Sequence, residues 1–161
     1  MKKLLLILSI MLMAHTIFGQ IQQQTNNIEN SIGTLIVKVQ GLKTTDGQLI
    51  IGLYNIAADF PEKTPFKGSF TKISTNIEEI TFENIPNGTY ALFVWHDINN
   101  NGKMDKDDAG IPIDGLGFYN YVMEKMELPT FQQVSFLFAG ANQTITIDMQ
   151  YGLPTKQKPK Q

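Results

Sequence analysis

The sequence contains neither cysteine nor arginine. The missing cysteines exclude disulfide bonds, a thiolate zinc site and a thiol nucleophile. All 13 basic residues are lysines, and the formal net charge is −2. Nucleic-acid binding requires a basic surface, and bidentate recognition of phosphate is usually the work of arginine. We therefore expect no nucleic-acid partner.

Long apolar runs are also scarce, and the longest stands at the N-terminus. Lys2 and Lys3 precede an apolar stretch over residues 4–13, and a small residue follows at Gly19. This pattern is typical of a secretory signal peptide, whereas a transmembrane helix needs about 20 apolar residues. The alternative is an uncleaved anchor. We predict export to the periplasm or the exterior, with no integral membrane segment in the mature chain.

The remaining chain divides by composition. Residues 20–31 are polar and predict a disordered linker, and residues 152–161 are rich in lysine, proline and glutamine and predict a flexible tail. Between them, residues 32–151 are long enough for one domain with its own core. We therefore expect a signal peptide over 1–19, a linker over 20–31, a single domain over 32–151 and a tail over 152–161.

Short apolar segments alternate with turn residues throughout this domain, and no segment has the period of an amphipathic helix. About seven short strands at such spacing indicate an all-β antiparallel sandwich, with a closed barrel as the alternative. The Asp46-Gly47 pair predicts a hairpin turn. A long gap in strand signals runs from Asp97 to Thr130. The predicted strands cover residues 34–39, 48–54, 70–73, 79–82, 89–96, 133–138 and 144–151.

The predicted core follows from alternation along these strands. Residues that alternate along a strand share one face of the sheet. The segment 90–96 should therefore place Ala91, Phe93 and Trp95 together. The expected core residues are Val37, Leu53, Phe82, Ala91, Phe93, Trp95 and Phe136.

The long gap begins with a segment that matches a twelve-residue calcium loop. Oxygen-bearing side chains stand at positions one, three, five, nine and twelve, glycine stands at position six, and position seven would offer its backbone carbonyl. Two features differ from the usual pattern: position twelve is aspartate instead of glutamate, and the loop follows a strand. The alternative is a solvated Asx-rich turn. We predict weak calcium binding by Asp97, Asn99, Asn101, Lys103, Asp105 and Asp108 around Gly102.

Aromatic residues follow the loop. Phe118, Tyr119 and Tyr121 stand beside three glycines. Aromatic rings beside polar groups suit carbohydrate or peptide ligands, but aromatic residues also dominate the burial of protein cores. We therefore expect either a ligand-binding surface, with a carbohydrate or protein partner at the cell envelope, or a covering for the edge of the core.

The sequence shows no catalytic constellation. His96 is the only histidine after the N-terminal segment, and one histidine without cysteine does not make a zinc site. His96 and Asp97 are neighbours on a strand, so their side chains should diverge. Asp114 with Glu124 or Glu127 is a possible acid–base pair, but nothing in the sequence brings them together. We expect no enzymatic activity, and keep a hydrolase centred on His96 and Asp114 as the remote alternative.

Four segments of this chain resemble the bacterial DUF2141 proteins, which are exported proteins of uncharacterised function. The segments are residues 82–91 (FENIPNGTYA), residues 96–105 (HDINNNGKMD), and the pair Gly110-Ile111-Pro112 and Gly115-Leu116-Gly117-Phe118. The Pro86-x-Gly88-x-Tyr90 turn also looks like the transthyretin-like and carboxypeptidase-regulatory modules. The resemblance implies a prealbumin-type β-sandwich and supplies no activity. We thus expect an exported binding or structural module, with a carbohydrate- or peptide-binding accessory protein as the alternative.

Overall fold

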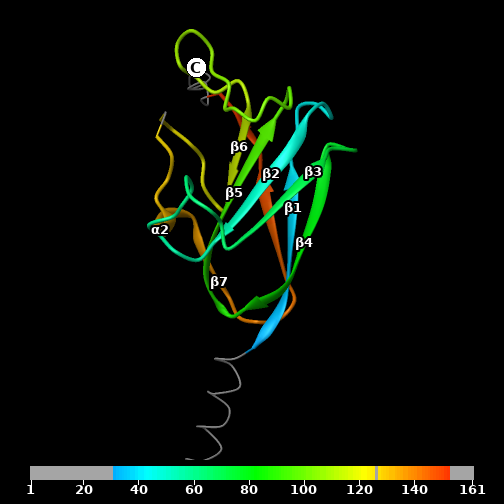
Figure 1. Cartoon of the computed structure of the whole chain (residues 1–161), viewed down its shortest axis with the longest axis vertical. Helices are drawn as coiled ribbons and strands as arrows, with labels where there is room; N and C mark the ends of the chain where they lie inside the picture. The colour runs from blue at the N-terminus through cyan, green and yellow to red at the C-terminus, as the bar shows by residue number, and fades with distance from the viewer. Residues whose placement is uncertain (1–30, 126, 153–161) are drawn as a thin grey trace, which may run out of the picture.

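The computed structural model describes residues 31–125 and 127–152. The predicted signal peptide, most of the linker and nearly all of the C-terminal tail lie outside these residues. Within them the chain is almost entirely β-strand and forms two sheets (Figure 1). No helix of this part of the chain is long and apolar enough to cross a membrane.

The smaller sheet has three strands in the order β4-β1-β8. Its central strand β1 (Ile32–Gln40) pairs antiparallel with β4 (Ile77–Pro86) and parallel with β8 (Gln143–Asp148). Met149 then leads directly into β9 (Gln150–Tyr151), which belongs to the other sheet. The chain therefore passes from one sheet to the other within one residue.

The larger sheet has the order β3-β2-β5-β6-β9. The strand β5 (Gly88–Asp97) is flanked on one side by β2 (Gln48–Tyr54), which in turn pairs with β3 (Lys67–Lys72). On its other side β5 pairs first with β7 (Ser135–Phe138) and then with β6 (Gly115–Phe118). A single helical turn, α2 (Phe131–Val134), precedes β7.

The main core lies between the two sheets and follows from the alternation of buried and exposed residues along the strands. Both sheets contribute alternate apolar side chains to it. These include Leu35, Val37 and Val39 of β1, Ile145 and Ile147 of β8, Leu49, Ile51 and Leu53 of β2, and Tyr90, Leu92 and Val94 of β5. The predicted core residues Val37, Leu53, Phe82 and Phe136 all belong to this cluster.

A second apolar cluster covers the outer face of the larger sheet. It gathers residues of β2, β5 and β6 with residues of the connections: Tyr54, Ala91, Leu116, Phe118, Met123, Phe131 and Val134. Ala91, Phe93 and Trp95 share one face as predicted, but that face is the outer one, where Phe93 and Trp95 are only partly buried. Alternation decides which residues share a face and leaves open which face meets the other sheet.

The all-β expectation is confirmed, and four details of it are corrected. The described chain has nine strands instead of about seven, and the pairing of β1 with β8 is parallel. The Asp46-Gly47 turn does not close a hairpin, because β1 and β2 belong to different sheets. The predicted gap also contains the strand β6, whose sequence Gly-Leu-Gly-Phe lacks the β-branched residues that mark a strand.

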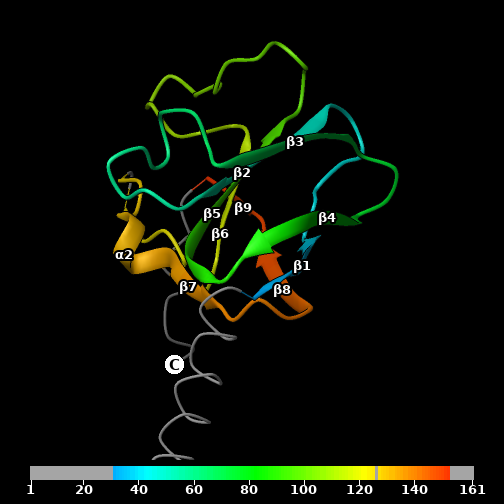
Figure 2. The same ribbon diagram turned by 60° about the horizontal axis from the view of Figure 1, so that its bottom comes forward.

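The predicted gap otherwise consists of two irregular segments. Residues 98–114 form a loop at the end of the sandwich where β5 ends, opposite the end that carries β7 (Figure 1). Residues 119–130 then lead towards α2 on the outer side of the larger sheet. The connection between β2 and β3, residues 55–66, lies on the same side of the molecule as α2 (Figure 2).

Candidate functional site

The loop over residues 98–114 begins at a buried carboxylate. Asp97, the last residue of β5, has no exposed surface. One of its oxygens accepts the backbone N–H of Asn101 at 3.1 Å, and the other accepts the N–H of Gly102 at 3.0 Å. The amide of Gln48 on the adjacent strand also donates to it, at 3.3 Å. These donors curl the following residues around the Asp97 side chain.

Two residues of the curl adopt left-handed backbone conformations. Asn100 has φ 57° and Gly102 has φ 68°. Asparagine and glycine tolerate this region better than other residues do, so the sequence allows the sharp turn without large strain. Gly47 packs behind the curl, where an added Cβ would lie 2.0 Å from the carbonyl oxygen of Asp97. The glycine of the predicted hairpin turn therefore makes room for the base of the loop.

Three polar side chains of the loop meet at one point. The Asn99 and Asn101 amides both donate to Oδ2 of Asp105, at 2.6 and 2.9 Å. The amide oxygen of Asn99 accepts the N–H of Asn101 at 3.1 Å, and that of Asn101 accepts the N–H of Lys103 at 2.7 Å. The structure thus brings together positions three, five and nine of the predicted calcium loop, while Asp97 at position one accepts backbone N–H groups of the same curl.

Position twelve is placed differently. Asp107 accepts the N–H groups of Ala109 and Ile111 at 3.0 and 2.8 Å, and its carbonyl accepts the N–H of Gly110 at 2.9 Å. Asp108 lies in the turn that these bonds close. Its side chain is exposed and takes part in none of the hydrogen bonds of the described residues. The structure therefore does not bring Asp108 to the group formed by the other predicted ligands.

The loop is closed by a residue that the calcium pattern leaves out. Asp114 is 1% exposed, and its Oδ2 accepts the indole N–H of Trp95 at 3.0 Å and the backbone N–H of Asp105 at 3.1 Å. Its Oδ1 accepts the N–H of Ile98 at 3.3 Å. One carboxylate thus holds both arms of the loop to the sheet. An aspartate before a glycine gives no sequence signal for this role, since that pair also marks ordinary turns.

The described residues contain no group of three or more His, Cys, Asp or Glu side chains arranged to hold a metal ion. The loop group has a different composition. Asp97 and Asp105 supply the carboxylates, while Asn99 and Asn101 supply amides. Calcium accepts amide and carbonyl oxygens as well as carboxylates, so this mixed set is chemically suited to it.

His96 is buried and has a hydrogen-bond partner on each ring nitrogen. Nδ1 lies 2.6 Å from the hydroxyl of Tyr151, and Nε2 lies 2.8 Å from the carbonyl oxygen of Asp46. Because a carbonyl only accepts, Nε2 carries the proton and Nδ1 accepts from the Tyr151 hydroxyl. Burial raises the pKa of Tyr151, the hydrogen bond from the Lys43 N–H lowers it, and the charge of Asp114 raises it.

The structure does not bring His96 and Asp114, the residues of the hydrolase alternative, into contact through their side chains. His96 faces the interior of the sandwich, and Trp95, the partner of Asp114, points to the opposite face. No hydrogen bond of the described residues joins His96 to Asp114. Glu124 and Glu127 are exposed, with no hydrogen bond to Asp114 in this part of the chain.

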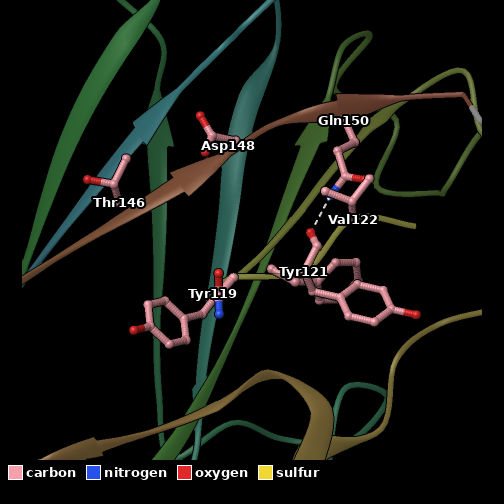
Figure 3. Close-up of a pocket in the computed structure, with 8 residues that line it drawn as sticks. Tyr119, Tyr121, Val122, Thr146, Asp148 and Gln150 are labelled. Carbon is pink, nitrogen blue, oxygen red and sulfur yellow. Dashed lines mark hydrogen bonds between the residues drawn. The ribbon is translucent and has the colours of Figure 1, made fainter. Parts of the chain in front are cut away.

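The predicted aromatic residues line one groove. Phe118 is buried against Phe93 and Phe60, while Tyr119 and Tyr121 are partly buried. All three predicted residues border a groove of about 390 Å³ that lies beside β8 and β9 (Figure 3). Thr146, Asp148 and Gln150 form its other side. The aromatic residues therefore cover the edge of the core and also border a cavity.

Gln150 fixes the aromatic segment beside this groove. Its side-chain amide donates to the carbonyl of Tyr121 at 2.9 Å (Figure 3). Its side-chain oxygen accepts the N–H of Met123 at 2.8 Å. Both sides of the segment 121–123 are thus held by one side chain from β9. The groove has a defined wall instead of a loose loop.

The fold and loop together define an all-β sandwich that carries an aspartate- and asparagine-rich loop at one end. The chain belongs to the DUF2141 family of uncharacterised proteins conserved in bacteria, which matches residues 37–146. No curated protein and no solved structure matches the chain. The family resemblance of the sequence is therefore confirmed, and its transthyretin-like detail stays a prediction.

Proposed function

We propose that this protein is an exported β-sandwich binding or structural module whose loop over residues 97–108 binds calcium weakly. The observation that carries the proposal is the convergence of Asn99 and Asn101 on Asp105, beside the buried carboxylate of Asp97. These four side chains occupy alternate positions of the loop, as a hard cation with six or seven oxygen ligands requires.

The ligands of the proposed site are Asp97, Asn99, Asn101, Asp105 and the backbone carbonyl of Lys103. The two amides now donate to Asp105. Calcium binding would exchange these N–H···O bonds for contacts between the ion and the amide oxygens. Asp97 keeps lone pairs for an ion, since an ionised carboxylate has about four acceptor sites and three are in use here.

Asp108 is the sixth ligand by sequence. Its exposed place in the 107–110 turn favours a shell completed by water over a direct carboxylate contact at this position. A site with two carboxylates and several neutral oxygens binds calcium weakly, with a Kd on the order of 10⁻⁴–10⁻³ M as in extracellular modules. Such an affinity suits an exported protein in a calcium-rich medium.

Isothermal calcium titration of the purified protein tests the proposal. Wild-type protein should bind one calcium ion, and Asp105→Asn should weaken binding at least tenfold because it removes one of two charges at the centre of the group. Asp108→Asn should change Kd less than threefold. Magnesium should bind poorly, since it prefers a smaller octahedral site and keeps its waters.

Matched variants make the titration decisive. Asp59→Asn removes a carboxylate from a different loop and should leave calcium binding unchanged. If wild-type protein shows no binding heat and the same melting temperature in millimolar calcium and in chelator, the loop is only a set of Asx turns. Equal losses in Asp105→Asn and Asp108→Asn would restore the ligand set that the sequence indicates.

Export is the second part of the proposal, and it rests on the sequence of residues 1–19. We propose that the mature chain begins near Gln20 and lies in the periplasm or outside the cell. Mass-spectrometric mapping of the N-terminus should find Met1 missing from envelope or medium fractions. Retention of Met1 there would contradict a cleaved signal peptide.

The groove beside Phe118, Tyr119 and Tyr121 supports a second candidate function, the binding of a carbohydrate or a peptide at the cell envelope. The supporting observation is that these residues border a defined cavity of about 390 Å³, within the range of roughly 300–1,000 Å³ for ligand sites.

We propose no enzymatic activity, because both ring nitrogens of His96 are engaged in the interior. A measured turnover that is lost in His96→Ala would contradict this.

A further inference from the structure

β8 is an edge strand whose outer side carries backbone groups without a partner in the described chain. In the described chain its partner strand is β1 alone, on the inner side. The N–H of Met149 donates to the carbonyl of Gln40 at 2.9 Å, and Gln40 lies opposite Asp148 in the register. Backbone groups alternate in direction along a strand, and in a parallel pair alternate residues face the partner. Thr144, Thr146 and Asp148 therefore turn their N–H and C=O groups away from β1.

The edges formed by β3 and β4 are protected. β3 and β4 lie on the opposite side, and the Lys67 side chain of β3 donates to the carbonyl of Glu83 in β4. Charged side chains and covered edges are how natural sheets avoid pairing with foreign strands. β8 has no proline, no bulge and only one charge, which stands at its end at Asp148. Apart from Asp148, its edge thus lacks these protections.

The groove described above runs along this edge. Thr146 and Asp148 line one side of it, and the segment 118–122 lines the other (Figure 3). A second hollow of about 330 Å³ is also lined by Tyr121 and Val122. The free edge is therefore bordered by a trough with a fixed opposite wall.

The charges of the trough indicate the kind of ligand. The groove has one charged lining residue, Asp148, and the second hollow has Glu124, Glu127 and Lys125, so the two together have three acids and one base. The two tyrosines present limited ring surface for stacking, since Tyr119 packs edge-to-face on Phe136 at 5.4 Å and is partly buried. A sugar needs an open aromatic face, whereas an extended polypeptide needs a row of free backbone groups. The trough offers a row of free backbone groups, so it suits an extended polypeptide.

We infer that β8 binds an extended, basic, proline-free polypeptide segment by strand addition in this trough. The ligand's backbone pairs with Thr146 and Asp148, and its alternate side chains lie against Tyr121 and Val122. In this mode main-chain bonds supply affinity and side-chain pockets supply specificity. The inference deepens the second candidate function by choosing peptide over carbohydrate, and it is independent of calcium.

Arrays of random octapeptides and of oligosaccharides, probed with the purified full chain, test this inference. Octapeptides enriched in lysine and free of proline should bind, and oligosaccharides should not. In the best octapeptide, N-methylation of alternate residues should weaken binding at least tenfold, because each methyl group removes a main-chain donor. Binding should also slow amide hydrogen exchange at Thr146 and Asp148.

Protein variants separate the backbone from the side chains. Thr146→Pro removes an outward N–H and should weaken binding at least tenfold, whereas Thr146→Val keeps the N–H and should change it less than twofold. Asp148→Asn keeps an acceptor for Gln40 and should weaken a lysine-bearing octapeptide about threefold. If Thr146→Pro fails to fold, the N-methylated peptides carry the test alone.

Absence of any octapeptide ligand, or tight binding of N-methylated octapeptides, would overturn strand addition. Oligosaccharide binding that moves the Tyr121 signals without protecting Thr146 would overturn the peptide choice while keeping the groove as a ligand site. Binding of neither class would remove both this inference and the second candidate function. Calcium titration of the same samples reports on the first proposal separately.

Discussion

Two long connections of this sandwich are ordered by opposite means. Residues 55–66, between β2 and β3, are held by aromatic packing: Phe60 contacts Tyr54, Phe118 and Phe131 at ring-centroid distances of 5.3, 6.5 and 6.1 Å. Residues 98–114, between β5 and β6, are held by the buried carboxylates of Asp97 and Asp114.

The difference between the two connections has a consequence for function. A loop longer than about 12–15 residues needs something to organise it. Packed aromatic side chains offer no oxygen ligands, so a cation does not stabilise an apolar anchor. Carboxylates and amides gathered in a polar loop retain acceptor sites and mutual repulsion, so under the proposed calcium binding a divalent ion would add stability there. The polar connection is therefore the one that can respond to its medium.

The largest effect should come from the anchor of the polar connection. Asp114→Ala leaves three N–H groups without an acceptor, those of Trp95, Ile98 and Asp105. Each unsatisfied buried donor costs about 1–3 kcal/mol, so we expect the free energy of unfolding to fall by about 3 kcal/mol. Urea unfolding followed by Trp95 fluorescence measures it. A loss below about 1 kcal/mol would mean that water replaces the carboxylate easily.

The apolar anchor should give the next effect. Phe60→Ala removes a partly buried ring, and we expect a loss of about 2 kcal/mol, below the 3–5 kcal/mol of a fully buried phenylalanine. Ile56→Ala in the same connection is the matched control, because Ile56 is 54% exposed, and it should cost less than about 0.5 kcal/mol. Similar losses for both would show that the ring contacts do not anchor this connection.

Calcium should distinguish the two connections. At ten times Kd it should raise the free energy of unfolding by about 1.4 kcal/mol. Wild-type protein and Phe60→Ala should gain equally, since distant sites contribute additively, while Asp105→Asn should gain about 0.4 kcal/mol or less. Thermal melts with calcium and with chelator provide the measurement. A smaller gain in Phe60→Ala would reveal coupling between the connections.

The smallest effect concerns alkaline pH. Tyr54 donates to the carbonyl of Pro61 at 2.7 Å, and burial raises the pKa of Tyr54 above its usual value of 10.0. The folded state therefore favours the neutral phenol, and this stability is full below pH 10 and is lost as the pH rises through the raised pKa. Tyr54→Phe should flatten the fall in unfolding free energy above pH 10. Burial also raises the pKa of Tyr90, so part of the slope should remain. An unchanged slope would contradict the role of Tyr54.

Local patterns predicted much of the fold. Alternation within the strands marked Val37, Leu53, Phe82 and Phe136 as core residues, and all four lie between the sheets. The strand β6 escaped prediction because its glycines are selected by contact. An added Cβ at Gly117 would lie 2.6 Å from Ile147 in the other sheet. Gly117 is small because a strand of the other sheet lies against it, and its neighbours in sequence give no indication of that contact.

Local spacing also predicted most of the polar loop. Asn99, Asn101 and Asp105 form one group around the curl that Asp97 caps, because alternate residues of a tight curl point inward, and that depends only on neighbours in sequence. Asp108 departs because the 107–111 turn directs the chain into a bridge between Lys106 and Pro112. The spacing of residues in the loop does not predict this bridge, because the bridge forms beyond the curl.

By itself the sequence determined most of the strands, the curl around Gly102 and the absence of thiol and arginine chemistry, because each depends on residue type or on close neighbours. Only the tertiary structure decided that Asp114 holds the loop, that β1 pairs parallel with β8, and that the free edge of β8 borders a groove. These features join residues far apart in the chain. Their partners are selected by packing between two sheets, and no local pattern records that choice.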